Sequence, residues 1–538
     1  MSIVDGQSGP SAVDSESAWA PLREPRYRTF WLAIMMANVG VWMQNVGAGW
    51  LMATLTSSPL LISAVQFATS LPVFLLGLPA GFIADRFDRR RITFFAYVWV
   101  LVVDLVLAGL TAASMVGPGS LLLCTVLLGI GFALAAPSVQ SIVVDLVPRP
   151  QLQQAIMLSG VSFNTARSVG PALAGVIMAW GGPAAVFAAS SLTFAAMLVV
   201  PGRIALPSPV QSGLPAERLL GGMRAGLRYA WYAAGVYAAL IRTVLFGLCA
   251  AAVWGLLPLI ARHSGNGGAG GFGALVACLG VGAVLSAFIA ARLRERFDCD
   301  RVSFAAALLF ALTMAVVAWA TTAWVVYPCM VLAGIAWALT LNTTYAVMQS
   351  VLPPWVRARC LALYLLLLQG AMALGSLAWG AVAEAVDVSV ALSAAAAALV
   401  AGAVYARLRH PLVTGQDAHV TPVDAWLPVV VQGDLEHDDG PIAIEIEYRI
   451  DAARRVEFIA AGEAVGRVRR RDGAMFWRLY RDLEQPGCYR ERFIVDSWAE
   501  YLRSRSRGTL ADRFTEERFR AFHAGPQPPV VRHSIAER

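Results

Sequence analysis

The sequence contains no lysine, so all 42 of its basic residues are arginines. It is poor in charge of either sign: 14% of its residues are charged, whereas soluble globular proteins carry about 25%. Hydrophobic residues make up 58% of the chain. This composition is not that of an ordinary soluble enzyme, and it indicates a polytopic membrane protein.

Motifs for catalysis, metal binding and nucleotide binding are also missing. The seven cysteines have neither metal-ligand spacing nor the pattern of a disulfide framework. No Ser/His/Asp arrangement stands out, and the glycine-rich run at 265–273 follows no strand. We therefore expect no cofactor, no metal site and no enzyme activity.

What the chain does have is a series of long apolar runs. A helix needs about 20 apolar residues to cross a bilayer. By that measure the first half contains spans near 30–52, 60–84, 92–114, 119–144, 155–178 and 183–204. The second half contains spans near 235–259, 270–291, 302–321, 324–350, 360–384 and 388–408. The predicted fold class is an all-α membrane protein of twelve helices in two six-helix bundles.

The arginines between these spans predict the orientation. Fifteen arginines lie in every second loop, and the loops between these contain only Arg262. Because arginine-rich short loops stay in the cytoplasm, both termini should be cytoplasmic. The net charge of +7 therefore reflects insertion into a bilayer, and we expect no nucleic-acid partner.

The polar segments divide the chain further. Residues 1–28 lack the features of a signal peptide and should form a disordered cytoplasmic tail. The two bundles should cover 29–204 and 235–410. Between them, 205–234 should be a linker with an amphipathic helix on the inner membrane surface. Residues 411–440 should be a second linker.

The last segment, 441–538, should be a cytoplasmic α+β domain. Alternating strand patterns at 442–450, 475–482 and 489–498 and helical patterns at 453–471, 498–505 and 510–523 precede a possible last strand, VVRHSI. The order β-α-β-β-α-β is that of a ferredoxin-like fold.

The two halves repeat each other. GFIADRFDRR at Gly81 aligns with AFIAARLRER at Ala287, and LGIGFALA at Leu128 aligns with AGIAWALT at Ala333. Such duplication is typical of transporters built from two similar bundles. In this alignment Ala291 stands opposite Asp85, which predicts that the second copy has lost its acid.

The segment GFIADRFDRRR, from Gly81 to Arg91, lies between the second and third spans. It resembles the Gly-x-x-x-Asp-Arg-x-Gly-Arg-Arg loop of the major facilitator superfamily, with Asp88 in place of the second glycine. We expect Gly81 to permit close helix contact. The resemblance implies a gating loop, for which the candidate residues are Gly81, Asp85, Arg86, Arg89, Arg90 and Asp145. Asp145 should pair with Arg86 or Arg90 and hold the inner side closed.

The fifth span contains NTARSVGPALAG, from Asn164 to Gly175. It resembles the Gly-Pro signature of antiporter-type facilitators, which implies export. Its candidate residues are Arg167, Gly170, Pro171 and Gly175. The alternative is a purely structural role, in which small residues provide a packing face and Pro171 kinks the helix.

Two charged residues lie inside spans. Asp104 is a candidate for ion coupling, or a structural polar contact between helices. Arg167 is a candidate for binding an anionic substrate, or for neutralising Asp104 or contacting the polar Asn164. Arg242, near the start of the seventh span, should extend to the inner surface.

Amides and a phenol mark the helices that line the cavity in the resembling family. They could bind a polar substrate or bond neighbouring helices. These cavity candidates are Asn38, Gln44, Asn45, Gln140, Asn164, Asn342, Tyr345 and Gln369.

The whole chain resembles the enterobactin-exporter-like branch, also called transmembrane secretion effectors, some of which carry a C-terminal domain similar to the antibiotic-biosynthesis monooxygenase fold. The resemblance implies a secondary transporter of a bacterial inner membrane. Such a protein would export a siderophore or drug-like compound by alternating access, coupled to an ion gradient as a proton antiporter. A homodimer through the C-terminal domain is implied by analogy. The alternative is a membrane-tethered enzyme or sensor whose C-terminal domain carries the activity.

Overall fold

The structure is a computed structural model that describes residues 19–199, 219–263, 268–412 and 436–536. The predicted tail up to residue 18, residues 205–218 of the first predicted linker and residues 413–435 of the second lie outside these residues. The side chain of Asp85 is likewise outside the described part.

The first half of the chain is helical from end to end. A short 3-10 turn, η2 (Ala20–Arg23), precedes α1 (Pro25–Leu55), α2 (Pro59–Arg86), α3 (Arg89–Ala112) and α4 (Pro118–Asp145). Another turn, η3 (Arg149–Gln151), leads into the long α5 (Leu152–Val199). This helix contains two predicted spans. They are separated at Gly182, whose positive φ of 68° interrupts the helix.

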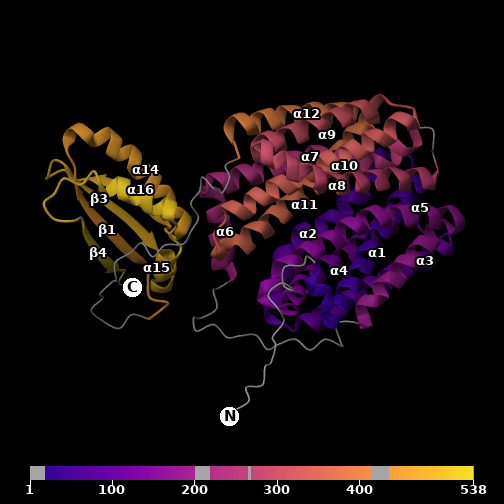
Figure 1. Cartoon of the computed structure of the whole chain (residues 1–538), viewed down its shortest axis with the longest axis horizontal. Coiled ribbons are helices and arrows are strands. Elements are labelled where there is room, and N and C mark those ends of the chain that lie inside the picture. The colour runs from indigo at the N-terminus through magenta and orange to yellow at the C-terminus, as the bar shows by residue number, and fades with distance from the viewer. Residues whose placement is uncertain (1–18, 200–218, 264–267, 413–435, 537–538) are drawn as a thin grey trace, which may run out of the picture. The chain divides into compact units, whose positions relative to one another are not determined.

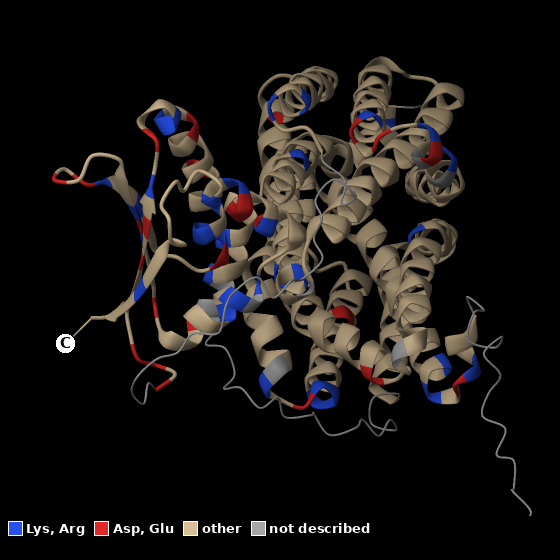
Figure 2. Cartoon of the chain, turned by 60° about the vertical axis from the view of Figure 1, so that its left-hand side comes forward, with Lys and Arg blue, Asp and Glu red and all other residues tan. Residues whose placement is uncertain are grey.

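The second half follows the same plan after α6 (Leu219–Tyr232). Its long helices are α7 (Ala234–His263), α8 (Ala269–Arg296), α9 (Cys299–Trp319), α10 (Ala323–Val351), α11 (Pro354–Ala385) and α12 (Val388–Arg409). Figure 2 shows that the bodies of these helices carry few charges and that most arginines and acids gather near helix ends.

Ten described helices are long and apolar enough to cross a membrane. This number counts α5 once and leaves out α1, which is 31 residues long but contains Asn38, Gln44 and Asn45. With α5 divided at Gly182 and α1 included, the described helices account for all twelve predicted spans. The predicted fold class is confirmed.

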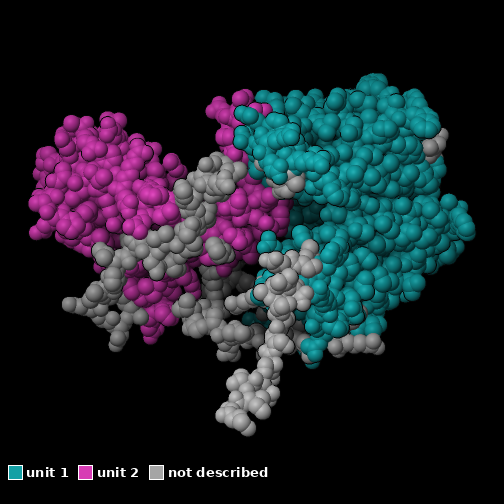
Figure 3. Space-filling model, viewed as in Figure 1, with its two compact units in different colours: residues 1–213, 242–343, 365–405 teal, residues 214–241, 344–364, 406–538 magenta. Residues whose placement is uncertain are grey.

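The chain separates into two compact units, coloured in Figure 3. The first contains most of both helical bundles, including residues 242–343 and 365–405. The second contains residues 214–241, 344–364 and 406–538, so α6 and the start of α11 belong to the same unit as the C-terminal domain.

The C-terminal domain has the predicted ferredoxin-like topology. Its elements are β1 (Ile442–Arg449), η5 (Ala452–Arg454), α14 (Arg455–Asp472), β2 (Phe476–Arg481), β3 (Cys488–Val495), α15 (Trp498–Ser506), α16 (Leu510–Arg520) and β4 (Val530–Ile535). The sheet is antiparallel in the order β2-β3-β1-β4, and β1 pairs with β3 from Ile442↔Val495 to Arg449↔Cys488. Helices α14 and α16 cover one face of it (Figure 1).

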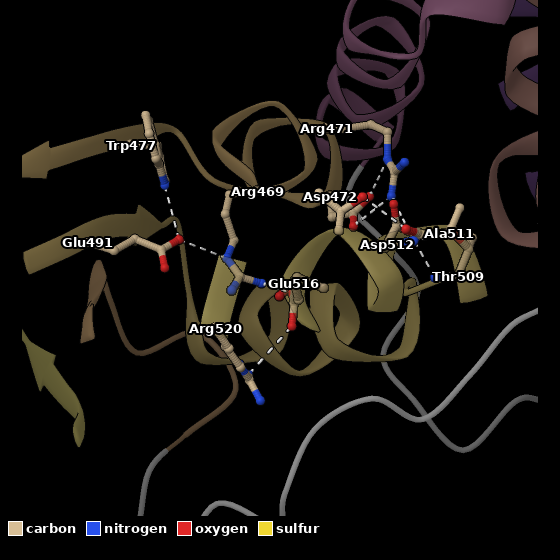
Figure 4. Close-up of polar contacts among 12 residues, drawn as sticks. Arg469, Arg471, Asp472, Trp477, Glu491, Thr509, Ala511, Asp512, Glu516 and Arg520 are labelled. Atoms are coloured by element: carbon tan, nitrogen blue, oxygen red, sulfur yellow. Dashed lines mark hydrogen bonds and ion pairs between the residues drawn. The ribbon is translucent and has the colours of Figure 1, made fainter. Parts of the chain in front are cut away.

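A buried ionic centre joins this sheet to its helices. Glu491, fully buried on β3, accepts hydrogen bonds from Arg469 at 3.2 Å, Trp477 at 3.0 Å and Tyr448 at 3.1 Å, and Arg469 also pairs with Glu516 (Figure 4). Burial alone would lower the pKa of Arg469, but Glu516 and Glu491 raise it above its ordinary value. The guanidinium therefore stays charged, and each carboxylate depends on it.

We expect Glu491→Gln to destabilise the C-terminal domain by about 3 kcal/mol, because it leaves Arg469 with one carboxylate and offers an amide to three donors. The measurement is urea unfolding of the full-length protein, followed by alkylation of the buried Cys488 and quantified at the peptide level.

The control is Glu445→Gln, which removes an exposed partner of Arg492 on the same sheet. It should change the stability by less than about 0.5 kcal/mol. Equal midpoints for the two variants would contradict the assigned role of Glu491.

Candidate functional site

The gating segment is mostly helical, and its loop is only two residues long. Helix α2 ends at Arg86, Phe87 caps it, and Asp88 caps the start of α3 by accepting a hydrogen bond from the Arg90 backbone N–H at 2.9 Å. Asp88, which stands where the resembling family has glycine, therefore caps the start of the next helix.

Asp145 of α4 pairs with Arg89 at 2.6 Å. The predicted partners, Arg86 and Arg90, were wrong, because the Arg90 guanidinium bonds to Asp88 at 3.0 Å. A Cβ atom on Gly81 would meet nothing within 4 Å among the described residues, so the role of Gly81 in helix contact stays a prediction.

The ends of α2 and α8 correct the alignment of the two halves. Both helices have 28 residues. The first ends at Arg86 and the second at Arg296, and each of these arginines is followed by Phe-Asp. This match places Glu295 opposite Asp85. The second copy has therefore kept an acid, and the alignment that put Ala291 there was wrong because it ignored where the helices end.

Contacts of α5 and α11 show the same duplication in space. A Cβ atom on Gly170 of α5 would lie 2.7 Å from the Trp42 Cβ of α1, and one on Gly375 of α11 would lie 2.9 Å from the Ala251 Cβ of α7. Side chains are excluded at both places, because the helices are too close for them.

One turn further along, the same two helices cross to the opposite half. Gly175 of α5 packs on Gly270 and Gly273 of α8, and Gly380 of α11 packs on Leu60 and Ser63 of α2. Leu60 and Ser63 occupy the positions in α2 that Gly270 and Gly273 occupy in α8. The motif glycines therefore hold each half together and hold the halves to each other.

Polar contacts also join the halves, at the end of the bundles away from the arginine-rich loops. The Arg262 guanidinium at the end of α7 donates to the Ala53 carbonyl oxygen of α1. Glu384 at the end of α11 accepts from the Ser58 hydroxyl at 2.7 Å and from the Leu60 backbone N–H at 3.3 Å. Any motion that separates the halves at this end has to break these bonds.

Asp104 is fully buried on α3. One of its carboxylate oxygens accepts from the hydroxyls of Ser190 at 2.6 Å and Ser191 at 2.9 Å, both in the second part of α5. Its other oxygen has no hydrogen-bond partner in the described structure. The arrangement lacks a cation, so the predicted alternative of a pair with Arg167 is wrong.

The cavity candidates fall into different surroundings. On α1, Asn38 donates to the Ser162 hydroxyl at 3.4 Å, and Asn45 lies on the same stripe two turns later. Gln44 is buried on the face where Gly40 and Gly47 contact the second part of α5.

The remaining candidates lie on four other helices. Gln140 and Asn342 are exposed, Asn164 bonds to its own helix at the Gly160 carbonyl, and Tyr345 packs on Tyr364. Gln369 is half-buried on α11. None of these positions decides between substrate binding and helix contact, so their roles stay predictions.

Sequence reasoning missed an aromatic cluster between the halves. The ring of Trp42 lies 6.0 Å from Phe163 of α5 and 5.9 Å from Trp254 of α7, and Trp254 lies 5.5 Å from Trp337 of α10. Each of these residues resembles any other core aromatic in the sequence. Only the helix packing brings them together next to Arg167.

A second polar assembly connects α6 and α11 to the C-terminal domain. Arg228 of α6 pairs with Glu500 at 3.3 Å, and Arg507 donates to Glu500 at 2.6 Å. The Arg507 guanidinium lies 4.5 Å from the ring of Trp355 in the first turn of α11, and that of Arg471 lies 5.2 Å from the ring of Tyr229. These cations serve both an ion pair and an aromatic face.

The opposite side of α6 stays bare. Leu227 and Trp231 of this helix are 58% and 65% exposed. One face of α6 thus contacts the C-terminal domain and the other presents apolar side chains, as a helix at a membrane surface would.

Comparison with known proteins now places the chain. A family model described as "Transmembrane secretion effector" matches residues 16–538. The chain belongs to this family of major facilitator transporters. Members are transporters and not enzymes, so this protein is a multi-pass membrane transporter that acts on a small molecule.

Two relatives of this chain are transporters. A staphyloferrin A transporter of Staphylococcus aureus (strain NCTC 8325 / PS 47) is 23% identical over 356 residues, 65% of this chain and 87% of the relative. An uncharacterized MFS-type transporter, YfiS, of Bacillus subtilis (strain 168) is 30% identical over 148 residues, 27% of this chain and 34% of the relative.

Solved structures agree on the fold. A bacterial homologue of the human lysosomal transporter Spinster, inward-facing and unoccupied, has a TM-score of 0.56 at 15% identity, covering 72% of this chain and 96% of that one. A bacterial homologue of the iron transporter ferroportin, in an inward-facing state, has a TM-score of 0.54 at 15% identity, covering 71% and 97%.

We expect Arg507→Ala to loosen α6 and the first turn of α11, because it removes a buried cation that contacts Glu500, the Asp472 carbonyl and Trp355. Loss of such a group should speed amide exchange in α6 by about tenfold or more. Hydrogen exchange with peptide-level mass spectrometry on the full-length protein measures this.

Arg513→Ala is the matched control, because Arg513 is exposed and pairs only with Glu517 one turn away among the described contacts. It should leave exchange in α6 unchanged. Unchanged exchange in the Arg507 variant as well would show that the domain contributes nothing to the stability of α6.

Proposed function

We propose that this transporter exports a small organic molecule across the bacterial cytoplasmic membrane by alternating access, with proton antiport as its energy source. Both termini lie in the cytoplasm, where the arginine-rich loops stay. The proposal includes a homodimer through the C-terminal domain, which rests on the resemblance alone.

The observation that supports the proposal is the location of the described polar contacts between the halves. Arg262 and Glu384 join them at the end away from the arginine-rich loops. With those loops in the cytoplasm, this end is the outer one, and the conformation is closed toward the outside. A transporter that alternates between two states needs such bonds to be few and breakable, since the two states differ by only a few kcal/mol.

The cargo class and the direction come from the relatives and the helix-5 motif. The family description names secretion, and one relative is named for staphyloferrin A. The Gly-Pro signature at Gly170 and Pro171 resembles that of antiporters. Export of a siderophore or a drug-like compound agrees with the family description, with the named relative and with the Gly-Pro signature.

In this proposal the inner gate includes the Arg89–Asp145 ion pair, which joins α3 to α4 within the first half and is formed in the state that is closed toward the outside. Its side chains are 31% and 27% exposed, so the pair is weak enough to break and remake. Asp85, Arg86 and Arg90 supply the other charges of the gate. Asp145 is positioned to hold α3 against α4 in one state and to release it in the other.

Asp104 is the proposed proton carrier. It is a fully buried carboxyl group whose side-chain partners in the described structure are two hydroxyls, which can bond either its charged or its protonated form. A carboxyl group neutralised by arginine would lose that freedom.

In inverted vesicles with an imposed proton gradient, we expect gradient-dependent uptake of at least one compound from a panel of catecholate siderophores and lipophilic cations. Asp104→Asn keeps hydrogen-bonding atoms but cannot change charge. We therefore expect it to lower uptake to the level seen without a gradient, while counterflow exchange continues. Purified protein in proteoliposomes, followed by mass spectrometry of the contents, gives the measurement.

Asp85→Ala is the gate variant and should reduce both uptake and counterflow, by about tenfold if it shifts the two states by about 1.4 kcal/mol. Gradient-dependent uptake by Asp104→Asn would remove Asp104 from the coupling mechanism. Movement only toward the other side of the membrane would overturn export.

A further inference from the structure

Arg167 is a buried arginine without a counter-charge. Its exposure is 7%, it lies midway along a membrane-spanning segment, and its Nε has no hydrogen-bond partner. Among the described residues, no carboxylate and no carbonyl oxygen contacts its guanidinium. A buried charge in a membrane span is costly, and such residues usually pair.

The other buried arginine of the bundles shows the usual solution. Arg242 of α7 is also 7% exposed, and it forms an ion pair with Asp300 of α9. Arg167 therefore departs from the pattern that this same chain follows elsewhere.

The direction of the side chain follows from its neighbours on α5. Phe163 and Gly170 face α1, whereas Ser168 and Pro171 face α8, where Gly280 and Gly273 approach them. Because successive residues turn by about 100° around a helix, Arg167 lies between these two faces. It thus points into the junction of α1, α5 and α8, next to the aromatic cluster of α1 and α7.

Two buried hydrogen-bond donors of that junction have no acceptor in the described structure. The Nε1 of Trp42 is buried and has no hydrogen-bond partner in the described structure, like the Nε of Arg167. Asn38 and Asn45 lie on the same stripe of α1 as Trp42. The rings of Phe163, Trp42 and Trp254 form an apolar wall beside these donors. An acceptor-rich anion with a flat apolar body would satisfy both features.

The internal duplication shows that packing does not require an arginine here. Gly170 and Gly175 match Gly375 and Gly380 in their contacts, so the position equivalent to Arg167 is Met372. Met372 is 5% exposed and fills its place with an apolar side chain. The second half reaches the same helix packing without a charge, so the charge in the first half serves something other than the fold.

We propose that Arg167 binds an anionic group of the transported molecule, with Trp42 as a second donor and the Phe163–Trp42–Trp254 wall holding an aromatic or apolar body. The cargo is then an organic anion, such as an aromatic carboxylate. This inference rests on the proposed transport function and names the substrate class of the same site.

The test compares 2-naphthoate with 2-naphthamide, which share one skeleton but differ in charge. Binding to the full-length protein in nanodiscs is measured by the shift in thermal unfolding and by calorimetry. We expect naphthoate to bind at least about tenfold more tightly than naphthamide, as a charge-assisted hydrogen bond provides. Arg167→Met should abolish this difference, and Arg167→Lys should keep part of it.

Stability gives the second readout. Arg167→Met copies the residue of the second half and removes an unpaired charge, so the variant should fold and unfold at a temperature no lower than the parent. Arg242→Met, which leaves Asp300 unpaired, should unfold at a lower temperature and should keep the preference for naphthoate.

Several outcomes would overturn the proposal. One is an equal preference for naphthoate in the parent and in Arg167→Met, and another is no preference in the parent. A marked loss of stability in Arg167→Met would show a structural partner for Arg167. Transport of a neutral or cationic compound, undisturbed by Arg167→Met, would keep the transporter proposal and remove the anion site.

Discussion

Helix association in this protein depends on backbone contact. In a bilayer, helices gain little from the hydrophobic effect on meeting one another, because lipid chains are as apolar as their own side chains. Close approach, with its dispersion contacts, has to provide the attraction. At Gly170, Gly375 and Gly380 the neighbouring helix lies where a side chain would be. These positions decide which helices touch, and all other groups are placed by that choice.

The same constraint explains why so few polar groups can carry function. A charge inside the bundles has to be paired, placed at a helix end, or kept for a ligand. Asp145, Arg242 and Glu384 belong to the first two classes, each with a partner in the described structure. In the described structure Asp104 accepts from two hydroxyls but contacts no cation, and the Nε of Arg167 has no hydrogen-bond partner. The candidates for transport are thus the residues that the fold has left unneutralised.

The C-terminal domain depends on the opposite principle, since water is its solvent. Its centre is ionic, with Arg469 between Glu491 and Glu516 and with Arg471 bonded to both Asp472 and Asp512 (Figure 4). Burial would raise the pKa of Asp512, but Arg471 and Thr509 outweigh it and hold that pKa below its ordinary value. The cationic side chains Arg471 and Arg507 extend from this network to Tyr229 of α6 and Trp355 of α11. The domain therefore contacts two segments that border the second bundle.

The sequence by itself determined the spans and the order of elements in the C-terminal domain, and the positive-inside rule adds a prediction of their sidedness. Each of these follows from local composition: apolar runs have to be buried, arginines stay out of hydrocarbon, and strand and helix periods differ. Only the tertiary structure decided the partners. Asp145 meets Arg89 and not Arg86 or Arg90, Glu295 and not Ala291 stands opposite Asp85, and Trp42 packs on Gly170, one turn from Arg167. These outcomes depend on where helices end and how they are rotated, and a shift of one residue turns a side chain by about 100°.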